Sequence, residues 1–183
     1  TAENLDNKIK EFWPKNGSKI HEIKKYVKKY LKEKIVIKCG GRILLDPELF
    51  NNFINDITIL KKLGLTPIVV HGGGPRIKKK LEKLNIKTKF IMGLRVTDKK
   101  IIKVVEEVMT DFNKEIVNAL QKKECKAKSI MVSENNAIYV EQKNIELGYV
   151  GKPTKIDNKL INNLIEENFI PVVSPMGLDQ KKQ

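Results

Sequence analysis

Residues Pro67 to Pro75 read P-I-V-V-H-G-G-G-P, the most informative stretch of the sequence. The β-branched run before His71 favours a buried strand, and the three glycines permit a tight turn and a close backbone approach. Pro75 suits the first helical position, where no N–H is needed. The stretch predicts a strand, a glycine loop and a helix N-terminus whose free N–H groups suit an anion, with a sharp turn that binds nothing as the alternative.

A second strand precedes this stretch and also runs into glycines. Ile35 to Ile37 lead to Lys38 and then to Gly40 and Gly41. Asp46 followed by Pro47 predicts a capped helix between the two strands. A strand, helix, strand unit is expected to pair its strands in parallel with a right-handed crossover. Both glycine loops, and Lys38, should then emerge on the same edge of the sheet, where ligands bind in open α/β folds.

The rest of the chain alternates helices and strands, which predicts an α/β fold with a mainly parallel sheet. An amphipathic helix is expected from Ser18, its cap, to Leu31, as a partner helix, a membrane-surface helix or an outer helix lying on the body. Pro14 and Gly17 argue against a helix before it. Further helices are predicted near 76–84, 99–121 (capped by Thr97 or Asp98) and 157–168, and strands near 129–132, 137–140 and 170–173.

Length and composition exclude several classes of protein. The 183 residues fit one domain or one and a half, and 40% hydrophobic residues suffice for a core. No apolar run approaches the length of about 18 residues that a membrane span needs, so we expect no membrane segment. Two cysteines far apart give neither a disulfide framework nor a metal-binding spacing. We expect a reduced, cytoplasmic setting and no protein metal site.

The net charge of +14 indicates acidic partners, either nucleic acid or small anions. The excess is mostly lysine spread over the whole chain, and aromatic residues make up only 6%. Without aromatic side chains interleaved among basic ones, base stacking is not indicated. A lysine-rich surface around an anion site is therefore favoured over a nucleic-acid interface.

The glycine loops match neither common nucleotide-binding pattern. Ile77 stands where the dinucleotide fingerprint needs its last glycine, and no G-K-[ST] follows Gly40 and Gly41. Lys38 could neutralise charge on a transferring phosphoryl group, or it could be a solvated lysine at a strand end. Arg95 is one of few arginines and could bind a carboxylate through two hydrogen bonds, which lysine cannot do. His71 suits a structural role better than that of a base.

An ordered set of motifs closely resembles the N-acetyl-L-glutamate kinases of the amino-acid kinase superfamily. The resemblance covers about residues 34–178, and H-G-G-G-P with G-L-R-V-T-D at this spacing is its most specific part. The full set is K-C-G-G at Lys38, H-G-G-G-P at His71, G-L-R-V-T-D at Gly93, F-N-K-E-I-V at Phe112, L-G-Y-V-G at Leu147 and I-P-V-V-S-P-M-G at Ile170.

The resemblance implies a three-layer αβα sandwich and ATP-dependent phosphorylation of the γ-carboxylate of N-acetyl-L-glutamate, in arginine biosynthesis, with Mg²⁺ accompanying ATP. It implies that Lys38 stabilises the transition state and that the N–H groups of Gly40 and Gly41 meet the ATP phosphates. Gly73 and Gly74 would donate to the acceptor γ-carboxylate, and Arg95 would bind its α-carboxylate.

The resemblance also implies that the C-terminal nucleotide lobe is absent. Residues 33–183 would be the truncated, acceptor-binding N-terminal lobe, inactive alone, and residues 1–32 an extension with an amphipathic helix. A homo-oligomer is expected of the full-length enzyme. The alternatives are a non-catalytic acetylglutamate-binding or regulatory module, a related carboxylate or carbamate kinase, and a basic nucleic-acid-binding domain.

Overall fold

The structure, a computed structural model, describes residues 2–182 and is built on a parallel four-stranded sheet. The strand order is β1-β2-β8-β5, with β1 at Lys34–Cys39, β2 at Thr66–His71, β8 at Ile170–Val173 and β5 at Ala127–Ile130. In the pairing of β1 with β2, Cys39 lies opposite His71. The two strands therefore end side by side, and the prediction that both glycine loops leave the same edge is confirmed.

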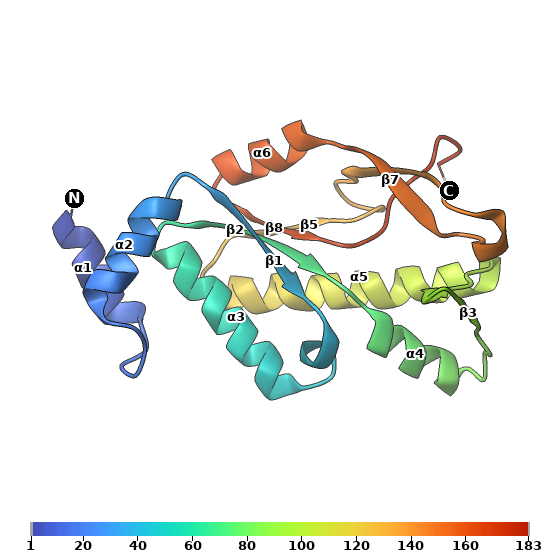
Figure 1. The fold of residues 1–183 in the computed structure, drawn as a ribbon, viewed down its shortest axis with the longest axis horizontal. Helices are drawn as coiled ribbons and strands as arrows, with labels where there is room; N and C mark the ends of the chain where they lie inside the picture. Colours follow the sequence, from blue (N-terminus) through green and yellow to red (C-terminus); the bar gives the residue numbers. More distant parts are fainter. Residues whose placement is uncertain (1, 183) are drawn as a thin grey trace.

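Helices cover both faces of this sheet (Figure 1). On one face α3 (Pro47–Lys62) and α5 (Lys99–Lys122) pack on β2 and β8 through a core that includes Ile57, Phe112 and Val172. On the other face α6 (Asn158–Glu166) packs its Leu164 against β2, β5 and β8. The predicted α/β fold in three layers is confirmed.

Short polar side chains set the starts of three helices. The Asp46 carboxylate accepts from the N–H groups of Glu48 and Leu49 at 3.0 and 3.2 Å, before Pro47 opens α3. Asp98 caps α5 in the same way, and Asp157 caps α6. Each cap satisfies N–H groups that have no partner inside the helix, so the predicted starts of α3, α5 and α6 are confirmed.

The N-terminal segment differs from the prediction. Helix α1 spans Ala2–Phe12, so reading Pro14 and Gly17 as excluding a helix before α2 was wrong: they follow its end. Its Ile9 is 1% exposed and packs with Ile23 and Val27 of α2 (Ile20–Tyr30), which lies outside the body near the end of α3. The predicted cap Ser18 is also wrong, because Lys19 is the N-cap and makes no side-chain cap bond.

A two-stranded ribbon lies outside the main sheet. Strand β6 (Ile138–Gln142) pairs antiparallel with β7 (Gly151–Ile156), and the short helix η2 (Ile145–Leu147) connects them. The sequence predicted β6 but not β7, whose six residues are all exposed. A strand without a buried face lacks the alternation that identifies strands in a sequence.

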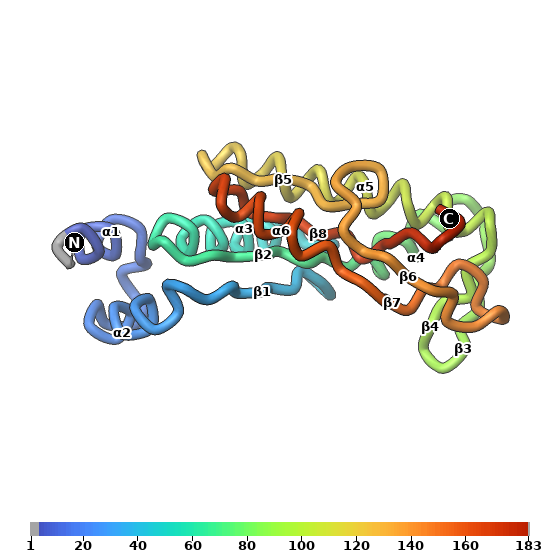
Figure 2. Tube along the Cα trace, turned by 90° about the horizontal axis from the view of Figure 1, so that it is seen from above, coloured from blue at the N-terminus to red at the C-terminus, as the bar shows by residue number. Residues whose placement is uncertain are grey.

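Three small elements follow the glycine loops. They are the short helix η1 (Gly41–Leu44), helix α4 (Gly74–Lys83) and the hairpin of β3 (Phe90–Ile91) and β4 (Leu94–Arg95). The molecule is elongated, with α1 and α2 at one end and the hairpin and the β6–β7 ribbon toward the other (Figures 1 and 2). Among residues 2–182, no helix is long and apolar enough to cross a membrane.

Candidate functional site

The two glycine loops are joined by a main-chain hydrogen bond. The N–H of Gly72 donates to the carbonyl oxygen of Cys39 at 2.8 Å, directly beyond the paired strand ends. Gly40 then precedes η1, and Gly73 precedes α4. The start of each helix presents free N–H groups and the positive end of its peptide dipoles. The sheet edge therefore offers N–H donors from two neighbouring loops.

Lys38 adds a positive charge at this edge. It lies opposite Val70 in the β1–β2 pairing, one residue before the strand ends, and its side chain is exposed. Its Cε atom lies 3.6 Å from the position that a Cβ on Gly40 would take. The side chain thus runs along the first glycine loop, at the strand ends from which both loops leave.

The glycines of the two loops differ in their surroundings. Gly41 has φ +59°, a left-handed conformation that other residues rarely adopt. A Cβ on Gly73 would stand 2.5 Å from the sulfur of Met109, so this glycine allows α5 to pack closely against the loop. A Cβ on Gly74 would meet nothing within 4 Å. Packing within the described chain therefore explains Gly73 but not Gly74, which is consistent with a ligand approaching Gly74.

Arg95 lies on a separate element. Its Nη1 donates to Thr88 Oγ1 at 3.0 Å, and its guanidinium lies 4.8 Å from the centre of the Phe90 ring, the residue paired with it in the hairpin. Burial lowers the pKa of Arg95. The hairpin directly precedes the start of α5 at Lys99, whereas Gly73 lies against Met109, ten residues or about 15 Å further along that helix. The structure does not place Arg95 beside the glycine loops.

The Arg95 hairpin is anchored to a second motif. The N–H of Thr97 donates to the carbonyl of Leu147 at 2.9 Å, and the N–H of Tyr149 donates to the carbonyl of Thr97 at 2.8 Å. A Cβ on Gly148 would collide with that same carbonyl oxygen. The segments G-L-R-V-T-D and L-G-Y-V-G, about 50 residues apart in the sequence, are thus one structural unit.

Arg76 connects the two glycine loops through its side chain, which the sequence did not predict. Its Nε donates to the carbonyl of Leu44 at 2.6 Å, and its Nη atoms bind both carboxylate oxygens of Glu115 at 2.6 and 3.2 Å. The guanidinium also stacks over Phe112, 4.2 Å from the ring centre. Its place directly after H-G-G-G-P, in a chain with few arginines, was the signal that could have identified it.

The buried groups beneath the loops carry no charge at neutral pH. Burial raises the pKa of the Cys39 thiol to about 11, which Arg76 opposes in part. Burial also lowers the pKa of His71, which is 1% exposed. His71 therefore has a neutral, buried ring rather than one free to act as a base. The cations at this edge include Lys38, Arg42 of η1 and Arg76, and the Arg76 charge is balanced by Glu115.

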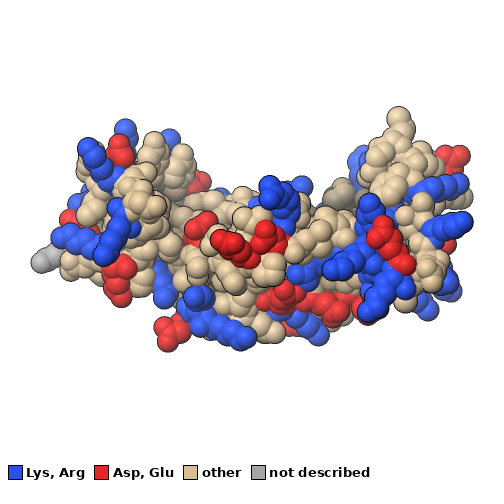
Figure 3. Space-filling model, turned by 90° about the horizontal axis from the view of Figure 1, so that it is seen from below, with Lys and Arg blue, Asp and Glu red and all other residues tan. Residues whose placement is uncertain are grey.

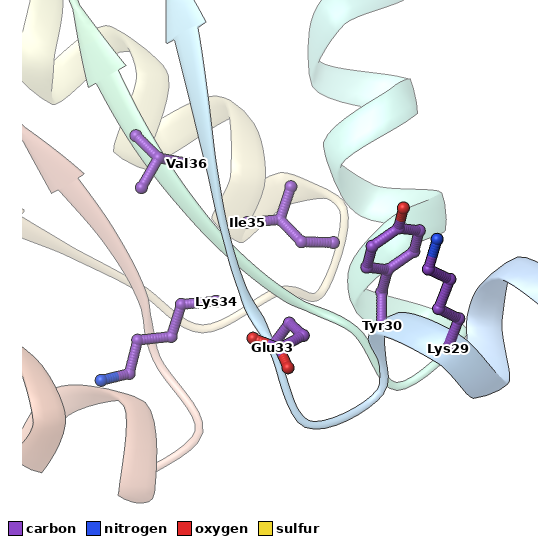
Figure 4. A pocket seen from close by; sticks show the side chains of 6 residues that line it. All are labelled: Lys29, Tyr30, Glu33, Lys34, Ile35 and Val36. Carbon is purple, nitrogen blue, oxygen red and sulfur yellow. The ribbon is translucent and has the colours of Figure 1, made fainter.

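One hollow of the described chain lies away from this edge. It measures about 470 Å³, and Figure 4 shows its lining side chains, which come from the end of α2 and from β1 and include Tyr30 and Val36. A second hollow of about 290 Å³ adjoins Arg76 and η1. We place the site by the strand ends, since the larger hollow is open and lacks convergent N–H donors.

Charges are mixed on the face drawn in Figure 3. Lys and Arg are interspersed with Asp and Glu there, and they are denser toward the end that carries the hairpin. No group of three His, Cys, Asp or Glu side chains within residues 2–182 could hold a metal ion. The site's chemistry, as far as the described residues show it, is anion binding by N–H donors and cations.

Comparison with known proteins points to one family. A model described as "Amino acid kinase family" matches residues 33–183. The chain is 54% identical over 170 residues to acetylglutamate kinase of Pelagibacter ubique (strain HTCC1062), covering 93% of this chain and 59% of that protein. It is 42% identical over 156 residues to acetylglutamate kinase of Petrotoga mobilis (strain DSM 10674 / SJ95), covering 84% and 52%.

Solved structures share the fold. The structure of smu.665 from Streptococcus mutans UA159 has a TM-score of 0.74 at 27% identity, over 83% of this chain and 62% of that one. N-acetylglutamate synthase from Neisseria gonorrhoeae, complexed with coenzyme A and N-acetyl-glutamate, has a TM-score of 0.73 at 17% identity, over 91% and 40%. The chain spans 59% and 52% of the length of the two curated relatives above.

Proposed function

Because this chain belongs to the amino acid kinase family, we propose that it forms the acceptor-binding part of an enzyme that transfers a phosphoryl group from ATP to the γ-carboxylate of N-acetyl-L-glutamate. This is a step of arginine biosynthesis. The observation that carries the proposal is the Gly72–Cys39 hydrogen bond, which joins two glycine loops beside Lys38. The names of the curated relatives support the substrate.

On the donor side, the N–H groups of Gly40 and Gly41 bind the ATP phosphates. Lys38, whose side chain follows this loop, neutralises charge that develops on the transferring phosphoryl group. ATP with Mg²⁺ supplies the phosphoryl group and screens its charge. Phosphoryl transfer needs positioning and positive charge more than covalent chemistry from the protein, which fits a site without a free base.

On the acceptor side, Gly73 and Gly74 donate their N–H groups to the γ-carboxylate. The open space around Gly74 leaves room for it. Arg95 binds the α-carboxylate from the hairpin, exchanging its bond to Thr88 for a charge-assisted pair. The acceptor then bridges the glycine loop and the hairpin, two elements that the chain alone holds apart.

The remaining assignments concern the organisation of the protein. Residues 33–183 form the acceptor lobe, and residues 1–32, with α1 and α2, form an extension to it. We propose a homo-oligomeric, cytoplasmic enzyme. Since the chain spans 59% of the Pelagibacter ubique relative, an acetylglutamate-binding module without turnover is the second candidate for the chain on its own.

Two assays test the proposal. Calorimetric titration of the chain with N-acetyl-L-glutamate should give saturable binding, with L-aspartate and carbamoyl phosphate as comparison ligands. Trapping an acyl phosphate with hydroxylamine in the presence of ATP and Mg²⁺ should give little product from the 183 residues alone. Absence of acetylglutamate binding contradicts the proposed acceptor, and robust turnover contradicts the assignment as one lobe.

A further inference from the structure

Asn113 places an amide group inside the apolar core. It follows the buried Phe112 on α5, and it is itself 0% exposed. A buried amide is costly unless it is hydrogen-bonded. Its Nδ2 lies 2.9 Å from the carbonyl oxygen of Val172 and 3.1 Å from His71 Nε2, whereas its Oδ1 has no hydrogen-bond partner among the described residues. The amide thus acts through its donors.

These contacts determine which nitrogen of His71 carries the proton. The Val172 carbonyl can only accept, so the amide must present its NH₂ group on that side. The second hydrogen of that group then points at His71 Nε2, which must accept with a lone pair. On the other side of the ring, Nδ1 lies 3.0 Å from the carbonyl oxygen of Gly72, which again can only accept. The proton of the neutral ring is therefore on Nδ1.

The ring has little freedom to leave this arrangement. It meets Phe112 edge to face, with ring centres 5.2 Å apart and planes at 87°. Burial lowers the pKa of His71, and Arg76 lowers it further, while the Gly72 contact opposes both. Cys39, paired with His71 across the strands, is a neutral thiol because its pKa is about 11. Two ionisable side chains thus lie near the ring. They are Cys39 and Arg76, and Arg76 is paired with Glu115.

The hydrogen bond to the Gly72 carbonyl has a geometric consequence for the next residue. The carbonyl of Gly72 and the N–H of Gly73 belong to one planar trans peptide, so they point in opposite directions. With the carbonyl held toward the buried ring, the Gly73 N–H is directed away from it. The Gly72 N–H is fixed independently by Cys39. Both peptides that flank Gly72 are therefore held in one orientation.

We propose that Asn113 is a positioning residue, which holds His71 in the Nδ1-protonated form and thereby orients the Gly73 N–H toward the acceptor. A single network, from Val172 through Asn113 and His71 to Gly72 and Cys39, fixes the ends of β8, β2 and β1. The inference rests on the proposed function, because an acceptor carboxylate is what gives the Gly73 N–H its role.

NMR of the ring nitrogens tests the first part without any ligand. The chain has two histidines, and the exposed His21 is an internal reference. His71 should show a protonated Nδ1 and an unprotonated Nε2. Asn113→Asp replaces the donor by an acceptor, so Nε2 should become protonated. Asn118→Asp adds the same charge at an exposed position of α5 and should leave the tautomer unchanged. A wild-type ring protonated at Nε2 overturns the proposal.

Two substitutions of His71 test the positioning role. His71→Asn places an amide donor near the former Nδ1, so it should keep the Gly72 bond and raise the Kd for N-acetyl-L-glutamate by less than about threefold. His71→Gln places its amide near the former Nε2, loses the Gly72 bond, and should raise the Kd about tenfold. Equal Kd values for the two variants overturn the positioning role.

Failure of the proposed function and failure of the positioning role give different results. If the wild-type chain does not bind N-acetyl-L-glutamate, the proposed function fails, and the ring NMR still decides whether Asn113 fixes the tautomer. If the wild type binds and Asn113→Asp protonates Nε2 without changing the Kd, the proposed function stands and the positioning role is overturned. If a variant does not fold, the wild-type tautomer still tests the first part of the proposal. The Kd of the His71 variant that folds is then compared with the Kd of the wild type to test the positioning role.

Discussion

The Nε atom of Arg76 donates a hydrogen bond to the main-chain carbonyl of Leu44 at 2.6 Å. Arg76 stands in the first turn of α4, and Leu44 ends η1, so this bond connects the helices that follow the two glycine loops. Glu115 on α5 fixes the guanidinium at its other edge. The relative position of the two glycine loops therefore depends on this side chain, in addition to the sheet register and the Gly72–Cys39 bond.

Replacing Arg76 by Lys should loosen this connection. Lysine keeps the charge but loses the bond to Leu44, the two-point pairing with Glu115 and the stacking on Phe112. Because the pair with Glu115 is partly exposed, most of the loss comes from the other two contacts, and we expect the free energy of unfolding to fall by about 1–2 kcal/mol. Denaturant unfolding measures it.

Lys78→Ala is the control for that experiment. Lys78 lies on α4 two residues away, and its side chain is 73% exposed. The substitution should change the unfolding free energy by no more than about 0.5 kcal/mol. Equal losses in Arg76→Lys and Lys78→Ala would show that the Arg76 contacts do not hold the loops.

Alanine at Gly73 and alanine at Gly74 should affect different properties. A Cβ at Gly73 requires the flexible end of the Met109 side chain to move, so Gly73→Ala should lower the unfolding free energy by about 1 kcal/mol. Gly74 lies at the start of α4 in open space, so Gly74→Ala should leave stability within about 0.5 kcal/mol and instead weaken N-acetyl-L-glutamate binding. Thermal unfolding and calorimetry of both variants check the pair. Unweakened binding by Gly74→Ala contradicts an acceptor at this loop.

Removing the Arg95 side chain should weaken acceptor binding. A charge-assisted pair contributes about 1.5–3 kcal/mol, so Arg95→Ala should raise the Kd for N-acetyl-L-glutamate about 10- to 100-fold. Lys89→Ala removes one positive charge from an exposed position next to the same hairpin and controls for long-range attraction. Similar Kd values for both variants would refute the assignment of Arg95.

Cys39 should make stability depend on alkaline pH. The folded chain keeps the thiol proton until about pH 11, whereas the unfolded chain releases it above its usual value of 9.0. Unfolding is therefore favoured increasingly between these values, and the stabilisation of about 2–3 kcal/mol present below pH 9 is lost as the pH rises through the folded pKa. Lysine titration adds a background, so the measurement is the difference between wild type and Cys39→Ala. Parallel pH curves would contradict this prediction.

Local patterns predicted the frame of the fold and part of the site. The β-branched runs before His71 and Lys38 and the caps Asp46 and Asp98 act within a few residues, and each was found as predicted. Helix α1 was missed although Leu5, Ile9 and Phe12 are spaced as on one helix face, because the breakers after it were given too much weight.

The missed parts of the site depend on long-range contacts. Arg76 and Glu115 lie 39 residues apart, and His71 and Asn113 lie 42 apart. No local pattern brings such pairs together, since the packing of α5 on the sheet decides which side chains meet. Strand β7 was missed for a related reason: its pairing with β6, and not a buried face, makes it a strand.

The most direct test of the central claim is the chemical-shift map of the backbone amides and arginine side chains during titration with N-acetyl-L-glutamate. We expect the largest shifts at the amides of Gly73 and Gly74 and at the Arg95 side chain, and we expect them to saturate together. Shifts confined to the hollow between Tyr30 and Val36, or no saturable shifts at all, would contradict an acceptor site between the glycine loop and the hairpin.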